Sequence, residues 1–294
     1  MGANYKIVVD STTDLTPELT QKWGLKVIPY IFTLDGKDYY NHLDYRELSV
    51  KDFYNALRDG KMATTTLVTA PRYIEAWEPI LKEGNDVLYM CLSSSLSKSY
   101  EQSVLAANEA MEAYPGRKVI TIDSKAASLG QGLLGYYAAK ARDEGKTLEE
   151  NAAYIEELIP CLQHWVVADD LHHLRRGGRV SGASAFVGTM LNIKPILTIL
   201  DSGKLVPLSK VRGWAKVREY IKERVDEYKF APTDQPVFIA HSDSLDMANN
   251  IADDIRAKFG TKEFVINNIG PVIGAHTGPG TIAVIFLGSE RPKA

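Results

Sequence analysis

The chain has 294 residues, a length that suits two domains of ordinary size. Its 34 Lys and Arg against 37 Asp and Glu give a net charge of −3, which argues against nucleic acid as the main partner because neutralising phosphates requires a basic surface. With 45% hydrophobic and 24% charged residues, the composition also excludes general disorder.

The first half alternates short apolar runs with helical patterns. Strands are predicted at 6–9, 26–33, 86–92 and 118–123, and a turn at Asp35-Gly36 predicts a hairpin between 30–34 and 37–40. Helices are predicted at 16–23, 49–59, 71–82, 102–113, 131–143 and 147–158, the last opened by a capping box of Thr147 and Glu150. This alternation predicts a mostly parallel, Rossmann-like sheet with helices on both faces.

From about residue 162 the pattern changes. Strands are predicted at 165–168, 196–200, 204–207, 236–241, 263–267 and 281–287, and helices at 214–229 and 244–259. We predict an α/β fold with two domains: 1–160, and a C-terminal α/β domain with a mixed sheet at 161–294. The boundary segment near Pro160 is short, so the two domains should touch.

The two cysteines, Cys91 and Cys161, lie in apolar stretches and form neither a disulfide framework nor a metal-ligand spacing. The first ten residues have no basic leader or long apolar segment. We therefore expect a cytoplasmic protein with no bound metal and no cofactor.

Three features that suggest chemistry have simpler explanations. The G-x-G-x-x-G run at 130–135 begins about seven residues after its strand, so close helix packing explains it better than dinucleotide binding. Asp10 and Asp14 follow the first strand and suggest a magnesium site, but nothing else in the chain completes one. His172 and His173, beside Asp169 and Asp170, point in different directions on a helix, so we interpret them as solvated helix surface.

Two hydroxyl-rich segments are predicted to lie in loops. Thr64-Thr65-Thr66 precedes a predicted helix, and Ser93-Ser94-Ser95-Leu96-Ser97 follows a buried strand. Ligands of open parallel sheets bind beyond the carboxyl ends of the strands, where such hydroxyls can bind one small acidic group. Helix capping is the alternative, although it explains one hydroxyl in each loop rather than three or four.

The second half contributes basic and glycine-rich segments. These are Arg175-Arg176-Gly177-Gly178-Arg179, Lys210-Val211-Arg212, and the segment 270–280, in which four glycines and two prolines surround His276. Arginine suits bidentate contacts with phosphate or carboxylate, and glycine allows close approach to a ligand. A structural corner with solvated arginines is the alternative.

Together these segments resemble the DegV family of bacterial fatty-acid-binding proteins, nearly end to end. The resemblance rests on 8–15, the threonine segment, Ser93–Ser97, 174–181, 194–197, 210–212 and 269–280. It implies a two-domain carrier, not an enzyme, that holds one long-chain fatty acid in an interdomain tunnel. In the family, hydroxyls of the two loops bind the carboxylate, which here implies Thr65 or Thr66, and Ser94 or Ser97.

The resemblance also implies that a separate fatty acid kinase phosphorylates the bound lipid to an acyl phosphate for phospholipid synthesis, with only transient membrane contact. Arg179, Arg212 and His276 match the family's basic residues and would bind the carboxyl end and support phosphoryl transfer. ATP and magnesium would belong to the partner, because the chain has no P-loop or kinase signature.

Two segments depart from the family pattern. Thr-Ser-Gln-Pro becomes Thr65-Thr66-Leu67-Val68, and Leu-Ser-Gly-Thr becomes Leu96-Ser97-Lys98-Ser99. Both changes keep the hydroxyls but affect loop shape and the surface expected to meet the kinase. A stand-alone phosphotransferase or esterase with His276 as base and a loop serine as nucleophile is the alternative function.

Overall fold

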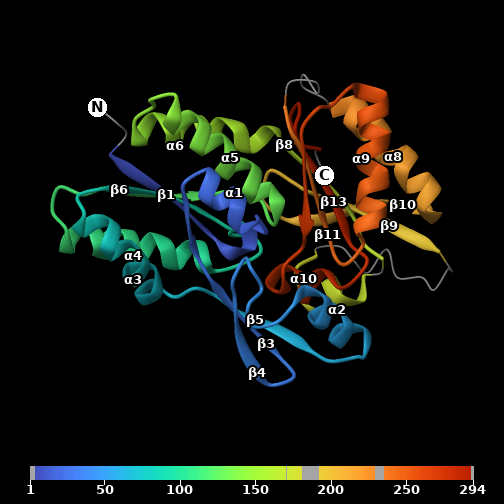
Figure 1. The fold of residues 1–294 in the computed structure, drawn as a ribbon, viewed down its shortest axis with the longest axis horizontal. Helices are drawn as coiled ribbons and strands as arrows, with labels where there is room; N and C mark the ends of the chain where they lie inside the picture. The colour runs from blue at the N-terminus through green and yellow to red at the C-terminus, as the bar shows by residue number, and fades with distance from the viewer. Residues whose placement is uncertain (1–3, 170, 181–191, 229–234, 293–294) are drawn as a thin grey trace.

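The computed structural model describes residues 4–169, 171–180, 192–228 and 235–292, and its strands form three sheets (Figure 1). Two of them, a parallel and a mixed sheet, establish the predicted α/β fold. The third is a small antiparallel sheet that the sequence pattern only partly indicated. None of the helices in these described ranges is long and apolar enough to cross a membrane.

The parallel sheet has the strand order β2-β1-β6-β7. Its strands are β1 (Tyr5–Asp10), β2 (Leu25–Ile28), β6 (Asp86–Cys91) and β7 (Val119–Asp123). Helices α3 (Ala70–Lys82) and α4 (Ser99–Ala113) cover one face, and α5 (Leu129–Asp143) and α6 (Leu148–Leu158) cover the other (Figure 1). This is the predicted arrangement, and the capping box of Thr147 and Glu150 is confirmed.

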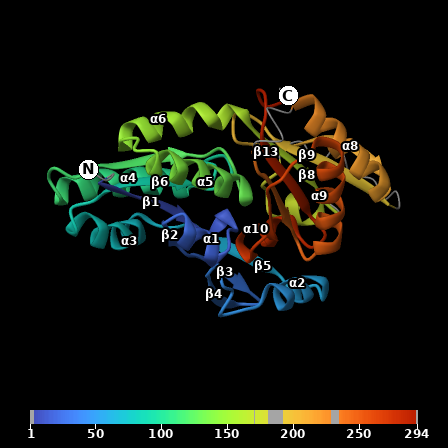
Figure 2. The same cartoon turned by 45° about the horizontal axis from the view of Figure 1, so that its top comes forward.

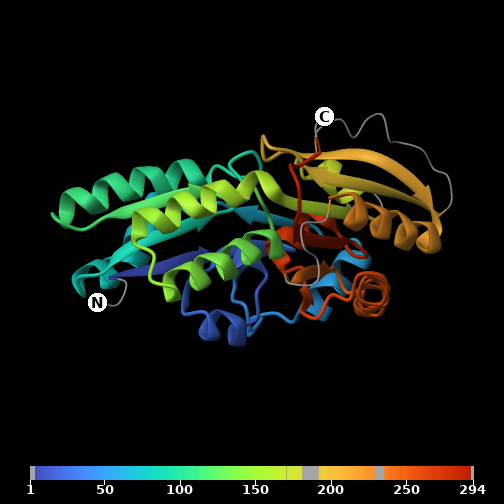
Figure 3. The same ribbon diagram turned by 90° about the horizontal axis from the view of Figure 1, so that it is seen from above.

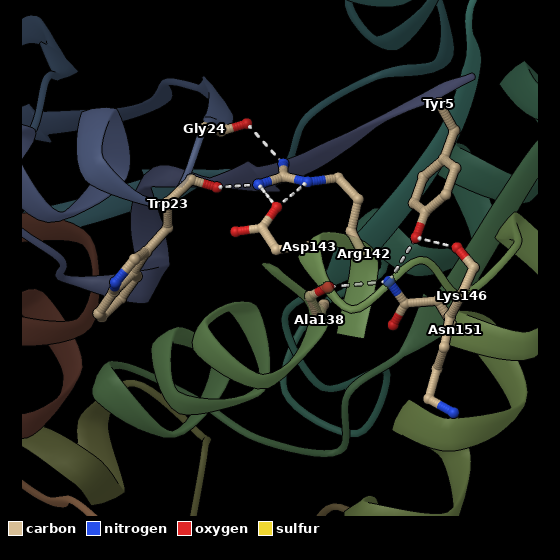
Figure 4. A network of polar contacts seen from close by, with 8 residues as sticks. All are labelled: Tyr5, Trp23, Gly24, Ala138, Arg142, Asp143, Lys146 and Asn151. Carbon is tan, nitrogen blue, oxygen red and sulfur yellow. Dashed lines mark hydrogen bonds and ion pairs between the residues drawn. The ribbon is translucent and has the colours of Figure 1, made fainter. Parts of the chain in front are cut away.

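Polar contacts fix α5 and α6 to the start of β1 and to the residue after α1 (Pro17–Lys22) (Figure 4). Asn151 on α6 donates to the Tyr5 hydroxyl and to the Ala138 carbonyl, each at 2.8 Å. Arg142 at the end of α5 donates to the Trp23 carbonyl at 3.1 Å, just after α1. These bonds hold the far end of α5, whose opposite end approaches the second half of the chain.

The predicted single strand at 26–33 is wrong. It divides at Pro29, and β3 (Tyr30–Leu34) joins the antiparallel sheet β4-β3-β5 with β4 (Lys37–Asn41) and β5 (Ala63–Thr66). The Asp35-Gly36 hairpin is confirmed, and both turn residues have positive φ, as a tight two-residue turn requires. The threonine segment is therefore strand β5, not a loop, which suits β-branched side chains.

The mixed sheet has the order β10-β9-β8-β13-β11-β12. Its strands are β8 (Leu162–Val167), β9 (Ile193–Ile199), β10 (Leu205–Arg212), β11 (Val237–His241), β12 (Phe264–Asn268) and β13 (Ile282–Leu287). Helices α8 (Gly213–Tyr228) and α9 (Leu245–Phe259) cover its outer face (Figure 2). The inner face meets α5, so the two halves are in contact (Figure 3).

The glycine-rich segment 270–280, whose composition suggests a loop, contains helix α10 (Pro271–Thr277). Pro271 occupies the first turn, and Gly278 ends the helix with φ +74°. These are ordinary start and stop residues for a helix. Helix α10 packs against α2 (Val50–Arg58), β5 and the short helix α7 (His172–Arg176), which positions its last turn beside the threonine strand.

Candidate functional site

A cavity of about 210 Å³ lies between the parallel sheet's carboxyl edge and the inner face of the mixed sheet. Most of its walls are apolar. They include Leu92 and Leu96 after β6, Ala127 after β7, and Val166, Ile199, Leu205 and Ala283 of the mixed sheet. An elongated apolar group fits such a lining, and the position beyond the parallel strands is where ligands of this architecture bind.

Hydroxyl and imidazole groups gather at one end of the cavity. Thr65 on β5 and His276 on α10 both line it, and Thr65 Oγ1 lies 2.9 Å from His276 Nε2. Gly177 leaves room for the imidazole, since a Cβ there would lie 2.4 Å from His276 Nδ1. Thr66, which also lines the cavity, is exposed, so this polar end reaches the surface.

Burial, followed by the nearby Arg179 charge, lowers the pKa of His276 to about 4. The imidazole is therefore neutral at pH 7 in the unliganded protein, with one nitrogen as donor and the other as acceptor. We expected a positive group here. Positive charge at the cavity comes from Arg179 and Lys98, which both line it, and Arg179 donates to the carbonyls of Leu96 and Gly177 at 3.3 and 2.5 Å.

The serines of the segment 93–97 have different surroundings. Ser97 lines the cavity and donates to Ser99 Oγ at 3.0 Å. Ser94 does not line it: its hydroxyl donates to Asp123 at 2.5 Å. Ser93 and Ser95 donate to the carbonyls of Gly203 and Ser202 in the β9–β10 turn, at 2.9 and 2.5 Å. Three of the four serines thus hold the loop and join the two halves, which explains the cluster without a ligand.

Arg212 lies apart from the cavity lining. It is exposed at the end of β10, where it pairs with Ile193. Of the seven candidate positions, the structure therefore brings Thr65, Thr66, Ser97, Arg179 and His276 to the cavity and leaves Ser94 and Arg212 outside its walls.

The two aspartates after β1 have structural partners. Asp10 accepts hydrogen bonds from the Thr12 amide and the Tyr89 hydroxyl, each at 2.9 Å. Asp14 contacts Ser128 Oγ at 2.5 Å and accepts from the Gly270 amide at 2.9 Å, and burial raises its pKa to about 8. Asp14 thus joins the segment after β1 to the residue before α10, while Asp10 holds the turn after β1 against Tyr89 of β6.

His173 does not lie on the open surface of its helix. His173 is half-buried and packs on α10, since a Cβ at Gly278 would lie 2.3 Å from its Cδ2. Asp169 forms an ion pair with Lys194. Asp170 lies outside the described residues. The prediction of a solvated surface is therefore wrong for His173, because α7 is covered by α10.

The glycines of the 130–135 run serve packing, as predicted. All three lie in α5, and a Cβ at Gly130 or Gly132 would lie 2.0 Å from His164 or 2.9 Å from Leu15. The run is therefore inside a helix and not in the turn after a strand, where a dinucleotide site requires it.

Six further polar side chains line the cavity and were not among the sequence candidates: Tyr30, Lys98, Ser128, His164, Thr277 and Thr281. Tyr30 and His164 are each 2% exposed. His164 follows Gln163, so strand β8 contains two adjacent polar residues and its sequence does not single out His164. Tyr30 and Ser128 are brought to the cavity by the break at Pro29 and by the loop before α5, and no sequence period indicates either.

A family model described as an uncharacterised protein of the DegV family matches residues 4–289. A DegV domain-containing protein of Clostridium perfringens is 39% identical over 287 residues, covering 98% of each chain. Among solved structures, a fatty-acid-binding DegV family protein of Thermus thermophilus has a TM-score of 0.88 at 30% identity, covering 97% of this chain and 99% of that one. DegV of Bacillus subtilis, a fatty acid binding protein, has a TM-score of 0.84 at 28% identity, covering 98% and 100%.

Proposed function

Because the chain belongs to the DegV family, we propose that it binds one long-chain fatty acid in the cavity and acts as a carrier. The observation that carries the proposal is the apolar cavity closed at one end by Thr65, Ser97 and His276. We place the domain boundary near Pro160, since β8 and the later strands of the described ranges belong to the mixed sheet. The ligand would then lie between domains 1–160 and 161–294.

The apolar walls account for affinity. Burying one methylene contributes about 0.8 kcal/mol, so a dozen contribute roughly 10 kcal/mol before ordering costs. That leaves enough for micromolar binding after several kcal/mol are lost on immobilising the ligand. The polar end of the cavity then determines the orientation in which the fatty acid binds.

Thr65 orients the carboxyl group in this proposal. Replacing it by the isosteric valine should weaken fatty acid binding about three- to tenfold, because one neutral hydrogen bond is lost. Thr64→Val is the matched control, since Thr64 is exposed on the same strand and does not line the cavity. Displacement of a fluorescent fatty acid measures both affinities, and equal affinities for the two variants would contradict the role of Thr65.

We further propose that the bound acid is presented to a separate fatty acid kinase. A carboxylate oxygen would attack the γ-phosphorus of ATP, forming an acyl phosphate while the bond to ADP breaks. Arg179, at the cavity mouth, would face the added negative charge. Transient contact with a membrane would supply the lipid. Arg212 would assist only if it meets the partner, because it is exposed and away from the cavity.

His276 supports the transfer step in this proposal. The His276→Ala variant should retain fatty acid binding within a few-fold, because the tail supplies most of the affinity, but form acyl phosphate about tenfold more slowly. The measurement adds a fatty acid kinase catalytic subunit, ATP and magnesium to the loaded protein. Full acyl-phosphate formation by the variant would count against this role.

The alternative of a stand-alone esterase or phosphotransferase receives little support from the contacts. His276 Nε2 contacts Thr65 and not a serine, while Ser97 and Ser94 donate to Ser99 and Asp123. Organic extraction of the purified protein distinguishes the two functions. A stoichiometric long-chain fatty acid, identified by mass spectrometry, supports the carrier, and a clean extract with turnover of a model ester supports the enzyme.

A further inference from the structure

His164 lies in the wall of the cavity, away from its polar end. It is on β8, three residues before Val167, which pairs with the first residue of β13. Strand β13 begins soon after α10, and three residues of strand place His164 about 10 Å along β8 from the residue that pairs with that start. Its neighbours in the wall include Val166, Leu205 and Ala283. The region that His164 faces is therefore one that an acyl tail would occupy.

No hydrogen bond of ordinary length and angle joins either ring nitrogen of His164 to the described residues, although the Leu162 backbone lies close enough to act on its pKa. Both ring nitrogens are buried, and the residue is 2% exposed. Helix α5 closes the other side of the ring, since a Cβ at Gly130 would lie 2.0 Å from Nε2. An unpaired donor and acceptor are costly in such a place, and buried polar groups in proteins are nearly always paired.

The ring is neutral. Burial lowers the pKa of His164 well below its usual value, and the nearby Arg291 guanidinium lowers it further. A neutral imidazole presents one N–H donor and one nitrogen acceptor, and a hydroxyl group can use either. A plain alkyl chain can use neither, so it fills the cavity but leaves the ring unpaired.

We propose that His164 selects long-chain fatty acids that carry an oxygen substituent, above all a hydroxyl, on the part of the tail that passes it. The proposal rests on fatty acid binding in this cavity. Thr65 and His276 would hold the carboxyl end, and His164 would form a hydrogen bond with the substituent on the acyl tail. It is a specificity-determining residue and takes no part in phosphoryl transfer.

Competition experiments on the delipidated full-length protein test this inference. A fluorescent fatty acid is displaced by stearic acid, by stearic acids hydroxylated at successive mid-chain carbons, and by one hydroxylated beside the carboxyl as the positional control. Three proteins are compared: wild type, His164→Leu, which removes both polar atoms, and His164→Gln, which keeps a donor and an acceptor. Thermal unfolding establishes that each variant is folded.

We expect wild type to bind at least one mid-chain isomer about threefold or more tightly than stearic acid, relative to the positional control. In His164→Leu this ratio should fall about tenfold, and His164→Gln should restore much of it. The inference is overturned if wild type rejects every mid-chain isomer as strongly as His164→Leu does, as it would if a buried water already satisfied the ring. Stearic acid distinguishes this failure from failure of the proposed function. If wild type binds stearic acid, only the inference about His164 fails, whereas if it binds no fatty acid at all, the proposed function itself fails.

Discussion

The Ala283→Phe variant is expected to lose fatty acid binding, by about 100-fold or more. Ala283 on β13 lines the cavity and is 5% exposed, so a phenyl group there occupies space that the tail requires. Excluding four methylenes removes about 3 kcal/mol of burial energy, which corresponds to roughly two powers of ten in affinity. The measurement is displacement of a fluorescent fatty acid, together with the amount of lipid that co-purifies.

The unfolding temperature of Ala283→Phe distinguishes a blocked cavity from a damaged fold. Because the ring enters existing empty space, Ala283→Phe should unfold close to the wild-type temperature, whereas overpacking a filled core typically costs 1–3 kcal/mol. Leu105→Phe is the control, since Leu105 is 52% exposed on α4 and does not line the cavity. A folded Ala283→Phe protein that still carries a stoichiometric fatty acid would contradict the location of the ligand.

The alternation of strands and helices predicts the parallel sheet well, because the rule that links it to topology depends on element order and not on side-chain detail. It fails at Pro29. The apolar run 26–33 is continuous in sequence, yet Pro29 lies between β2 and β3, which belong to different sheets. Which sheet a strand joins is decided by tertiary packing, and no local pattern records it.

The candidate site was predictable at the level of segments and less so at the level of side chains. Clustered hydroxyls pointed to the serine loop, but only contacts with Asp123 and with the β9–β10 turn distinguish Ser94 and its neighbours from Ser97. Helix α10 was missed because four glycines in 270–280 suggested a loop. Pro271 and Gly278 mark its two ends, and packing on α2 and β5 outweighs the poor helix propensity between them.

The contact between Gly130 and His164 makes a second strong prediction, this time for stability. Gly130→Ala would place a Cβ 2.0 Å from His164 Nε2 and 2.9 Å from Cδ2, where α5 meets the mixed sheet. The ring is buried and has no free space to enter except the cavity. We expect a loss of about 3 kcal/mol in the free energy of unfolding, which the gain of about 1 kcal/mol in helix propensity does not offset.

Gly135→Ala is the matched control in the same helix. Its Cβ would lie 3.3 Å from the Leu25 Cδ1 methyl, a contact that a small side-chain rotation relieves. We therefore expect Gly135→Ala to be neutral or stabilising by up to about 1 kcal/mol, measured by urea denaturation beside Gly130→Ala. Gly130→Ala should also weaken fatty acid binding, because α5 pushes the imidazole toward the ligand. Equal stabilities of the two variants would mean that Gly130 does not set the distance between α5 and β8. The His164 side chain would then be able to move away from an added methyl group at little cost.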